Sequence, residues 1–380
     1  MQAIYLDHAA TTPIHPDVLK VVVETMEEHF GNPSSVHSYG RKARQILDKA
    51  RMTAAKSIGA SDKDIIFTSG GTEADNLALI GVAEANKNKG NHIITTKIEH
   101  HATLHAAEKL EKEGYHVTYL DVQENGTIDI EQLKASLTDD TILVSVMMVN
   151  NETGVIQPIE AIGQLLEQHQ AYFHTDAVQA YGLLPINVKE LKVDLLTVSS
   201  HKINGPKGVG FLYVHPDVKM TAQQYGGEQE RKRRPGTENV AGIAGFAKAI
   251  EIAAEKQQER MQQYKHYRTL FLEQLEKSAI DFSINGTESE RVANIVNISF
   301  PGANVEQLLT NFDLSGIAAS SGSACTAGSV EPSHVLTAMF SENNPCTTNS
   351  IRFSFGLANN EENVVTAAEK VGQIVQRLTK

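Results

Sequence analysis

Short apolar segments alternate with helical patterns through the first two thirds of this 380-residue chain. The run 142–149 is apolar at all but one position, which is typical of a strand covered on both faces. Such alternation indicates a mainly parallel sheet with helices on both faces, and ligands of these sheets bind beyond the carboxyl ends of the strands. The predicted strands are 64–68, 92–96, 115–120, 142–149, 171–175, 194–198 and 210–214, with helices at 72–89, 100–113 and 158–169.

The last third of the chain has a different pattern. Residues 240–277 form one long helical pattern that could connect two domains, and a strand, a helix and a glycine- and serine-rich loop follow it. We therefore predict an α/β protein with a large domain of residues 15–260. A smaller α+β domain would comprise residues 1–14 and 261–380.

Two helices of this last third have predicted starting points. Asn304 with Gln307, and Asn359 with Glu362, have the three-residue spacing of a helix capping box.

The charge of the chain limits its partners. It has 34 basic and 46 acidic residues, a net charge of −12, so its field would repel nucleic acid. No segment approaches the roughly 20 apolar residues of a membrane helix, and the N-terminus lacks the profile of a signal peptide. The two cysteines lie far apart and form neither a disulfide framework nor a zinc motif. We expect a cytoplasmic protein with no membrane partner and no direct nucleic-acid partner.

A lysine and a carboxylate follow two of the predicted strands. Lys202 lies in Ser-Ser-His-Lys before a glycine-rich turn, and Asp176 begins Asp-Ala-Val-Gln, which ends at Gln179. Alone, Lys202 could be a surface residue and Asp176 a helix N-cap. Together they supply the amine for a Schiff base and the carboxylate for a ring nitrogen that pyridoxal phosphate requires. Gln179 could face the phenolic oxygen of that cofactor.

The segment 68–73 provides a candidate phosphate site. Gly70 and Gly71 free backbone N–H groups where a strand meets a helix N-terminus, and Thr72 adds a hydroxyl. The segment fits neither a Walker loop nor a GxGxxG fingerprint. The alternative is an ordinary glycine turn in which Thr72 caps the helix.

His100 opens another predicted helix and could stack on a cofactor ring or carry a proton. With His101 and His105 it could instead bind a metal, but no carboxylate completes a known ligand spacing. We therefore predict no metal site.

Ten motifs make the chain resemble the cysteine desulfurases of the NifS/IscS type, within the class V aminotransferase family of fold-type I pyridoxal phosphate enzymes. They occur in the family's order and extend nearly from end to end: YLDHAATTP, FGNPSSVH, SGGTEADN, EHHATL, NNETGVIQPI, HTDAVQ, SSHKINGPKGVG, RPGTEN, SSGSACTAG and IRFSFG.

This resemblance implies a pyridoxal phosphate site in which Lys202 forms the Schiff base and His100 stacks on the ring. Asp176 would pair with the pyridinium and Gln179 with the phenolate oxygen. The full set of implied cofactor-binding residues is Gly71, Thr72, His100, Asn151, Asp176, Gln179, Ser199, His201, Lys202 and Thr237.

The resemblance also assigns the phosphate and the substrate. Thr72, Ser199 and His201 would hold the phosphate, and Thr237 would reach the phosphate of the other subunit's cofactor in a homodimer. Asn151 and Arg352 would bind the carboxylate of L-cysteine. A planar guanidinium suits that task, and Arg352 otherwise stands as a charge inside an apolar strand.

Cys325 determines the implied chemistry. A lone cysteine is usually a small buried hydrophobe, but the small polar neighbours of Cys325 favour a mobile, exposed loop with an accessible thiolate. Cys346 has no comparable surroundings and is assigned no role.

In the resemblance Cys325 takes the sulfur of L-cysteine as a persulfide, and L-alanine is released, with Lys202 and His100 as the other catalytic residues. A protein acceptor in iron–sulfur cluster assembly or tRNA thiolation would receive the sulfur. The SSGSAC sequence resembles the group I branch of the family. SFGLANN after Arg352 departs from the usual SLGRFT and leaves the acceptor open.

Rival interpretations remain on the same fold, because a fold does not determine a reaction. They are a selenocysteine lyase, an aminotransferase and a kynureninase-like hydrolase, and of these an aminotransferase would need no Cys325 and would turn over with a keto acid. A non-catalytic docking module would have no need of Lys202, Asp176 and Cys325, all of which are present.

Overall fold

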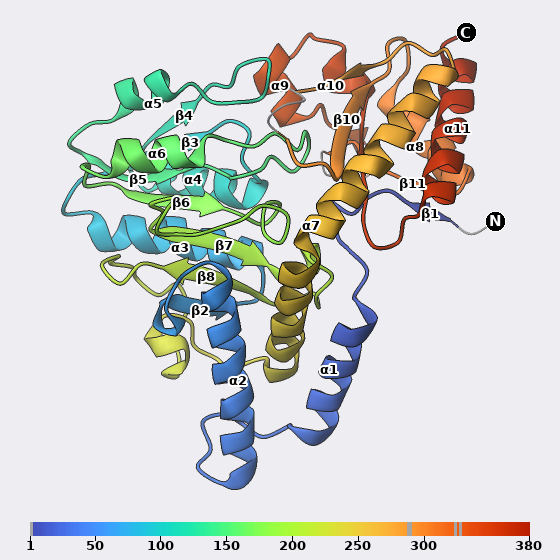
Figure 1. The fold of residues 1–380 in the computed structure, drawn as a ribbon. Helices are drawn as coiled ribbons and strands as arrows, with labels where there is room; N and C mark the ends of the chain where they lie inside the picture. The colour runs from blue at the N-terminus through green and yellow to red at the C-terminus, as the bar shows by residue number, and fades with distance from the viewer. Residues whose placement is uncertain (1–2, 287–290, 323–324, 327–328) are drawn as a thin grey trace.

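The computed structural model describes residues 3–286, 291–322, 325–326 and 329–380, with the backbone alone for 325–326 and 329–330. It confirms the predicted α/β class. A seven-stranded sheet has the order β2-β8-β7-β6-β5-β3-β4, in which β8 runs antiparallel to both neighbours and all other pairs are parallel (Figure 1). Its strands are β2 (Ile65–Thr68), β3 (His92–Thr96), β4 (His116–Leu120), β5 (Thr141–Ser145), β6 (Tyr172–Asp176), β7 (Leu195–Ser199) and β8 (Gly210–Val214).

Helices cover both faces of this sheet, which is why its strands are apolar at consecutive positions. Neighbouring residues such as Ile93 and Ile94 belong to different buried clusters, because side chains alternate between the two faces of a strand. One face packs against α3 (Gly71–Asn86) and α4 (His101–Lys112). The buried cluster on the other face includes residues of α2 (Ser38–Ser57), α5 (Ile130–Ser136), α6 (Ile159–Leu166) and α7 (Val240–Lys277).

A separate buried cluster, away from the large sheet, surrounds a three-stranded antiparallel sheet. Its strands are β14 (Ser350–Ser354), β10 (Ile295–Ser299) and β9 (Ser283–Ile284). The N-terminal strand β1 (Ile4–Tyr5) pairs with β11 (Ile317–Ala318), so both ends of the chain pack here. The remaining elements are α1 (Pro16–Glu28), α8 (Val305–Leu314), α9 (His334–Phe340), α10 (Cys346–Asn349), α11 (Glu361–Leu378), β12 (Cys325–Thr326) and β13 (Ser329–Val330), with 3-10 turns at Asp62–Asp64, Ser200–Lys202 and Gln229–Lys232.

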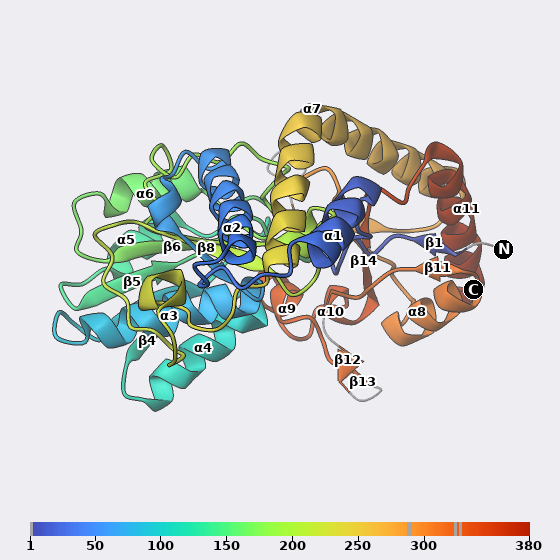
Figure 2. The same cartoon turned by 90° about the horizontal axis from the view of Figure 1, so that it is seen from below.

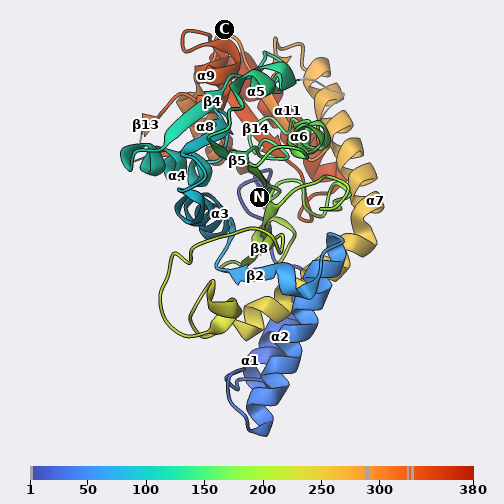
Figure 3. The ribbon, with the colours of Figure 1, turned by 90° about the vertical axis from the view of Figure 1, so that its left-hand side faces the viewer.

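The long helix α7 joins these two parts. Its first half packs in the cluster of the large sheet, with Phe246 and Ile250, and its second half, with Phe271 and Leu275, packs in the other cluster. Figures 1 and 2 show α7 passing from α1 and α2 to α11, and Figure 3 shows α1 and α2 extending away from the sheets. The division at residue 260 stays a prediction.

Strand β5 is shorter than the predicted strand 142–149. It ends at Ser145, although the next four residues are buried. The backbone still donates to β6 at alternate residues, from Val146 to His174 and from Met148 to Asp176, but the pairing with β3 ends at Val144. Burial beside the candidate site therefore explains the apolar sequence, where we had inferred a longer strand.

The predicted cap of the last helix was wrong by one residue. Asn360 caps α11 in a box with Asn363, whereas we expected Asn359 and Glu362. The amide of Asn359 has other partners: its nitrogen donates to the carbonyl of Tyr5, and its oxygen accepts from the Gly356 N–H. Local spacing could not reveal these contacts, because one of them joins the two ends of the chain.

Among the described residues, no helix is both long and apolar enough to cross a membrane.

An aromatic cluster should stabilise the second part of the fold. The fully buried ring of Phe353 lies 4.8 Å from that of Phe271 and 6.0 Å from that of Phe312. We expect Phe353→Ala to lower the free energy of unfolding by about 3–5 kcal/mol, because it leaves a cavity. Urea denaturation measures this change. Leu314→Ala, at a side chain 80% exposed, is the control and should change stability by less than about 0.5 kcal/mol.

Candidate active site

A cavity of about 190 Å³ lies beyond the carboxyl ends of the parallel strands. All predicted site residues except Thr237, Cys325 and Arg352 line it. They come from the segments that follow β2, β3, β5, β6 and β7, and they are Gly71, Thr72, His100, Asn151, Asp176, Gln179, Ser199, His201 and Lys202. The folding of the sheet thus brings together residues that are up to 131 positions apart in the sequence.

Lys202 ends a 3-10 turn that follows β7, and its amine is held by the N-terminal segment. Its Nζ donates to the carbonyls of Ala9 and Ala10, the latter at 3.0 Å. Burial, with the charge of Arg352 as the next cause, lowers the pKa of this amine to about 8. The carboxylate of Asp176 opposes this shift. A lysine with this pKa can give up and regain a proton near neutral pH.

Asp176 is the last residue of β6 and accepts a 2.8 Å hydrogen bond from the Val178 N–H. Burial raises the pKa of its carboxyl to about 6, while Lys202 and the bond from Val178 lower it. Gln179 is fixed close by, because its Nε2 donates to the carbonyl of Ala9 at 2.9 Å.

Two further buried carboxyls, Asp75 and Glu99, surround Asp176 and were missed in the sequence. Burial raises the pKa of Asp75 well above its usual range, and Asp176 and Glu99 raise it further. Burial also raises the pKa of Glu99 to about 8. His174, whose Nε2 lies 3.6 Å from Asp75, stays neutral because burial lowers its pKa to about 3. Burial thus disfavours the ionised forms of Asp75 and Glu99, whereas the Val178 N–H and Lys202 favour the ionised form of Asp176.

His100 is the N-cap of α4, and its Nδ1 accepts from the Ala102 N–H at 3.1 Å. The neutral ring must then carry its proton on Nε2. Burial, with Lys202 as the next cause, lowers the pKa of His100 to about 4. The rings of His101 and His105 stack at 5.2 Å. In the part of the chain that is described, no group of His, Cys, Asp or Glu is arranged to hold a metal.

The start of α3 forms a polar wall of the cavity. Gly70 has a φ of +151°, and a Cβ on Gly71 would lie 3.1 Å from the side chain of Val178, so glycine lets the helix N-terminus approach closely. The Ser199 hydroxyl is buried and has no hydrogen-bond partner among the described atoms. His201, whose pKa burial lowers to about 4, lies against Thr11 with 3.1 Å between Nδ1 and the hydroxyl.

Arg352 lies on β14, next to Asn151 but outside the set that lines the cavity. Its Nη2 donates to Asp7 at 2.7 Å and its Nη1 donates to the Asn151 carbonyl at 2.9 Å. Its Nε and the Asn151 Oδ1 are buried without partners in the described structure. A carboxylate could therefore bind to Arg352 without displacing Asp7.

Thr237 is not among the described residues that line the cavity, and the side chain of Cys325 lies outside the described part of the structure. Thr237 is exposed in the loop before α7. Cys325 begins β12, whose backbone pairs antiparallel with β13, and this hairpin projects beyond α9 and α10 (Figure 2). We had expected a loop without strands. The predicted exposure and mobility of the thiol lie outside the described residues.

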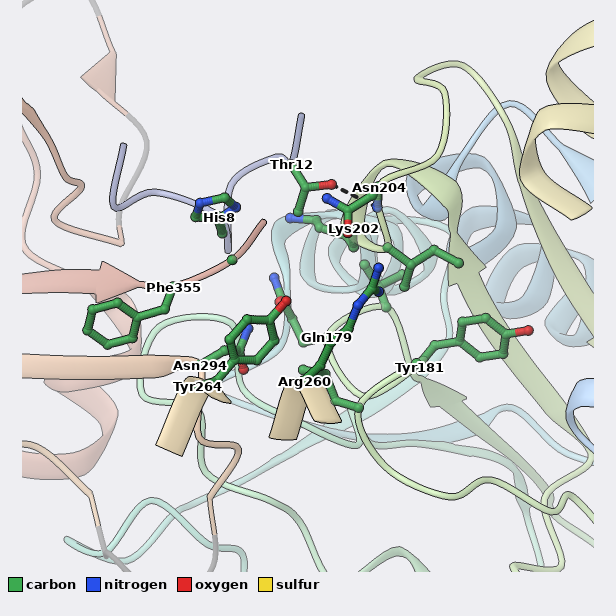
Figure 4. A pocket seen from close by; sticks show the side chains of 15 residues that line it. His8, Thr12, Gln179, Tyr181, Lys202, Asn204, Arg260, Tyr264, Asn294 and Phe355 are labelled. Atoms are coloured by element: carbon green, nitrogen blue, oxygen red, sulfur yellow. Dashed lines mark hydrogen bonds between the residues drawn. The ribbon is translucent and has the colours of Figure 1, made fainter. Parts of the chain in front are cut away.

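A second cavity, of about 30 Å³, borders Lys202 where the N-terminal segment meets α7 (Figure 4). His8, Thr12, Arg260 and Tyr264 contribute to its lining. This volume suits about one or two water molecules, so of these two cavities beside Lys202 it is the larger that can hold an organic ligand.

The large cavity fits pyridoxal phosphate. It contains a buried amine, a carboxylate for a protonated ring nitrogen, and an unpartnered hydroxyl beside a helix N-terminus that attracts phosphate.

Comparisons with known proteins agree with this chemistry. Residues 4–366 match the family model described as aminotransferase class-V. A protein of Bacillus subtilis (strain 168) that is provisionally named cysteine desulfurase IscS 1 is 56% identical over 379 residues. The alignment covers 100% of both chains. The cysteine desulfurase IscS of Dictyoglomus turgidum is 45% identical over 99% of this chain and 95% of its own. A solved structure described as a NifS-like protein is 34% identical, with a TM-score of 0.93 over 99% of this chain and 100% of that one.

The raised pKa of Glu99 predicts how the stability of the protein depends on pH. Its Oε1 accepts from Thr96 and from the Met147 N–H, and a glutamine oxygen can do the same. A folded-state pKa raised from 4.5 to about 8 gives a contribution to stability that is complete below pH 4.5 and is lost as the pH rises through about 8. Relative to the wild type, Glu99→Gln should gain stability over this window by up to about 1.4 kcal/mol per pH unit.

Urea unfolding at a series of pH values measures this gain. Glu160→Gln, at an exposed carboxyl, is the matched control. Parallel stability curves for Glu99→Gln and the wild type would contradict the raised pKa.

Proposed function

Because this chain belongs to the aminotransferase class-V family and is a cysteine desulfurase, we propose that it binds pyridoxal phosphate through Lys202 and passes the sulfur of L-cysteine to Cys325. The observation that carries this proposal is the buried amine of Lys202 in one cavity with the ionised carboxyl of Asp176. Bound there, pyridoxal phosphate would supply an electron sink for bond cleavage next to the substrate's amino group.

The residues of the cavity would hold this cofactor as follows. Asp176 supports the positive charge of the ring nitrogen, and the amide of Gln179 is available to the phenolate oxygen. Ser199, Thr72 and the Gly71 N–H receive the phosphate at the start of α3. The ring of His201 would also contact the phosphate. Thr237 would reach the phosphate of the cofactor in the partner subunit of a homodimer.

Lys202 and His100 would move protons during the reaction. The amine of Lys202, with its pKa lowered to about 8, can take the proton from the α-carbon of the substrate and return it. His100 would contact the cofactor and present its Nε2–H, because its Nδ1 is held by the backbone of α4. Both groups are buried, which excludes water from the site.

Arg352 and Asn151 would bind the carboxylate of L-cysteine. The ion pair with Asp7 and the bond to the Asn151 carbonyl fix the guanidinium plane before the substrate arrives. The unpartnered Nε–H of Arg352 then supplies one of the hydrogen bonds to the carboxylate.

In the sulfur-transfer step the Cys325 thiolate attacks the substrate's sulfur. A sulfur–sulfur bond forms and the bond between sulfur and the β-carbon breaks. The electron pair of the broken bond stays with the carbon skeleton, and the β-carbon gains a proton to become the methyl group of L-alanine. The persulfide left on Cys325 carries the sulfur to its acceptor.

We further propose that the protein works in the cytoplasm and delivers sulfur to a protein of iron–sulfur cluster assembly. Similarity to relatives named IscS supports this destination. A tRNA-thiolating enzyme is the alternative acceptor.

Replacement of Cys325 tests the proposed transfer. With L-cysteine and a reductant, Cys325→Ala should release L-alanine at least about 100-fold more slowly than the wild type, because the nucleophile is lost. Cys346→Ala is the matched control and should keep wild-type activity. An amino-acid assay of L-alanine measures both rates.

Full activity of Cys325→Ala would exclude Cys325 as the nucleophile and favour a lyase of the selenocysteine type. Turnover that required a keto acid would favour an aminotransferase.

A further inference from the structure

Both ends of the segment that carries Cys325 meet the carboxyl of Glu152. On the N-terminal side, a Cβ added to Gly322 would lie 2.6 Å from Glu152 Oε2, so the carboxyl packs directly on this glycine. On the C-terminal side, the Ser333 hydroxyl donates to the same Oε2 at 2.5 Å. Oε2 of Glu152 thus lies against both Gly322 and Ser333, the two residues that flank segment 323–332.

These contacts are specific to the residue types present. Gly322 has a φ of +88° and has no room for a side chain, so both its backbone and its packing require glycine. Ser333 is the N-cap of α9 and also accepts from the Leu336 N–H at 3.1 Å. The end of the segment, the start of α9 and Glu152 therefore form one connected unit.

Glu152 itself is held by the turn that follows β5 and by β10. Its N–H donates to Asn150 Oδ1 at 2.9 Å, and its carbonyl accepts from Asn297 Nδ2, on β10, at 3.3 Å. The side chain is 1% exposed. Glu152 follows Asn151, whose carbonyl accepts from Arg352, so it is one residue away from the proposed carboxylate site.

The surroundings of Glu152 favour its neutral form. Burial raises the pKa of its carboxyl, whereas the bond from Ser333 and the charges of Arg352 and His101 lower it. The carboxyl is therefore an anchor made of packing against Gly322 and a hydrogen bond from Ser333.

We propose that Glu152 is a positioning residue of sulfur transfer, which ties both ends of the Cys325 segment to the protein beside the substrate site. This inference rests on the proposed function. A tether at both ends restricts the volume that Cys325 can sample and raises its effective concentration at the substrate's sulfur.

The test separates sulfur transfer from the earlier chemistry. Exchange of the α-hydrogen of L-alanine in D2O needs Lys202 and the cofactor but not Cys325, and NMR follows it. With the holoenzyme, Glu152→Ala should keep this exchange within about 2-fold of the wild type, while L-alanine release from L-cysteine falls about 10- to 100-fold. Glu152→Gln keeps an oxygen that can accept from Ser333 and should restore most of the release.

A matched control is Glu342→Ala, which removes an exposed carboxyl near α10 and should change neither rate. Gly322→Ala probes the same contact from the other side if Glu152→Ala does not fold. It should lower release selectively, and by a smaller factor when Glu152 is already alanine, because the two residues interact.

Equal losses of exchange and release in Glu152→Ala and Gly322→Ala would overturn the proposal in favour of a general structural role. Unchanged release in both variants would also overturn it. Failure of the proposed function has another signature: the wild type would show no exchange, or Cys325→Ala would keep its release activity.

Discussion

Burial of an amine and a carboxyl at one edge of the large sheet is the constraint on which the rest of the site depends. Asp176 ends β6, and Lys202 ends the turn that follows the adjacent strand β7, so each charge is costly without the other. Their neighbours reduce this cost: His100 and His201 stay neutral, and the pKa values of Asp75 and Glu99 are raised. The cavity thus contains one positive and one negative group whose pKa values lie near neutrality.

The second part of the fold completes this site. The N-terminal segment packs with β11 and β14, and its carbonyls at Ala9 and Ala10 receive the Lys202 amine. Arg352 extends from β14 to Asn151, which follows β5 of the large sheet. The two parts of the fold therefore meet beside the same cavity, with α7 as their covalent link.

The sequence predicted the sheet and most of the cavity, because the strands are continuous apolar runs and the site residues lie directly after them. Asp75, Glu99 and Glu152 were missed, since an acidic residue beside polar neighbours is normally exposed and nothing local reveals its burial. The cap at Asn360 was missed for a related reason, because Asn359 is occupied by the distant Tyr5. The burial of these carboxyls and the position of this cap depend on contacts between segments that are distant in the sequence. The spacing of neighbouring residues does not reveal such contacts.

The pKa of Lys202 is the most direct measure of this account. The apoprotein would be mixed with pyridoxal phosphate between about pH 6 and 11, reduced with borohydride, and the labelled Lys202 peptide quantified by mass spectrometry. Only the neutral amine reacts. The account predicts an initial rate that rises with a midpoint near pH 8. A midpoint near 10.5, the usual pKa of a lysine in water, would show an ordinary solvated amine and contradict the account.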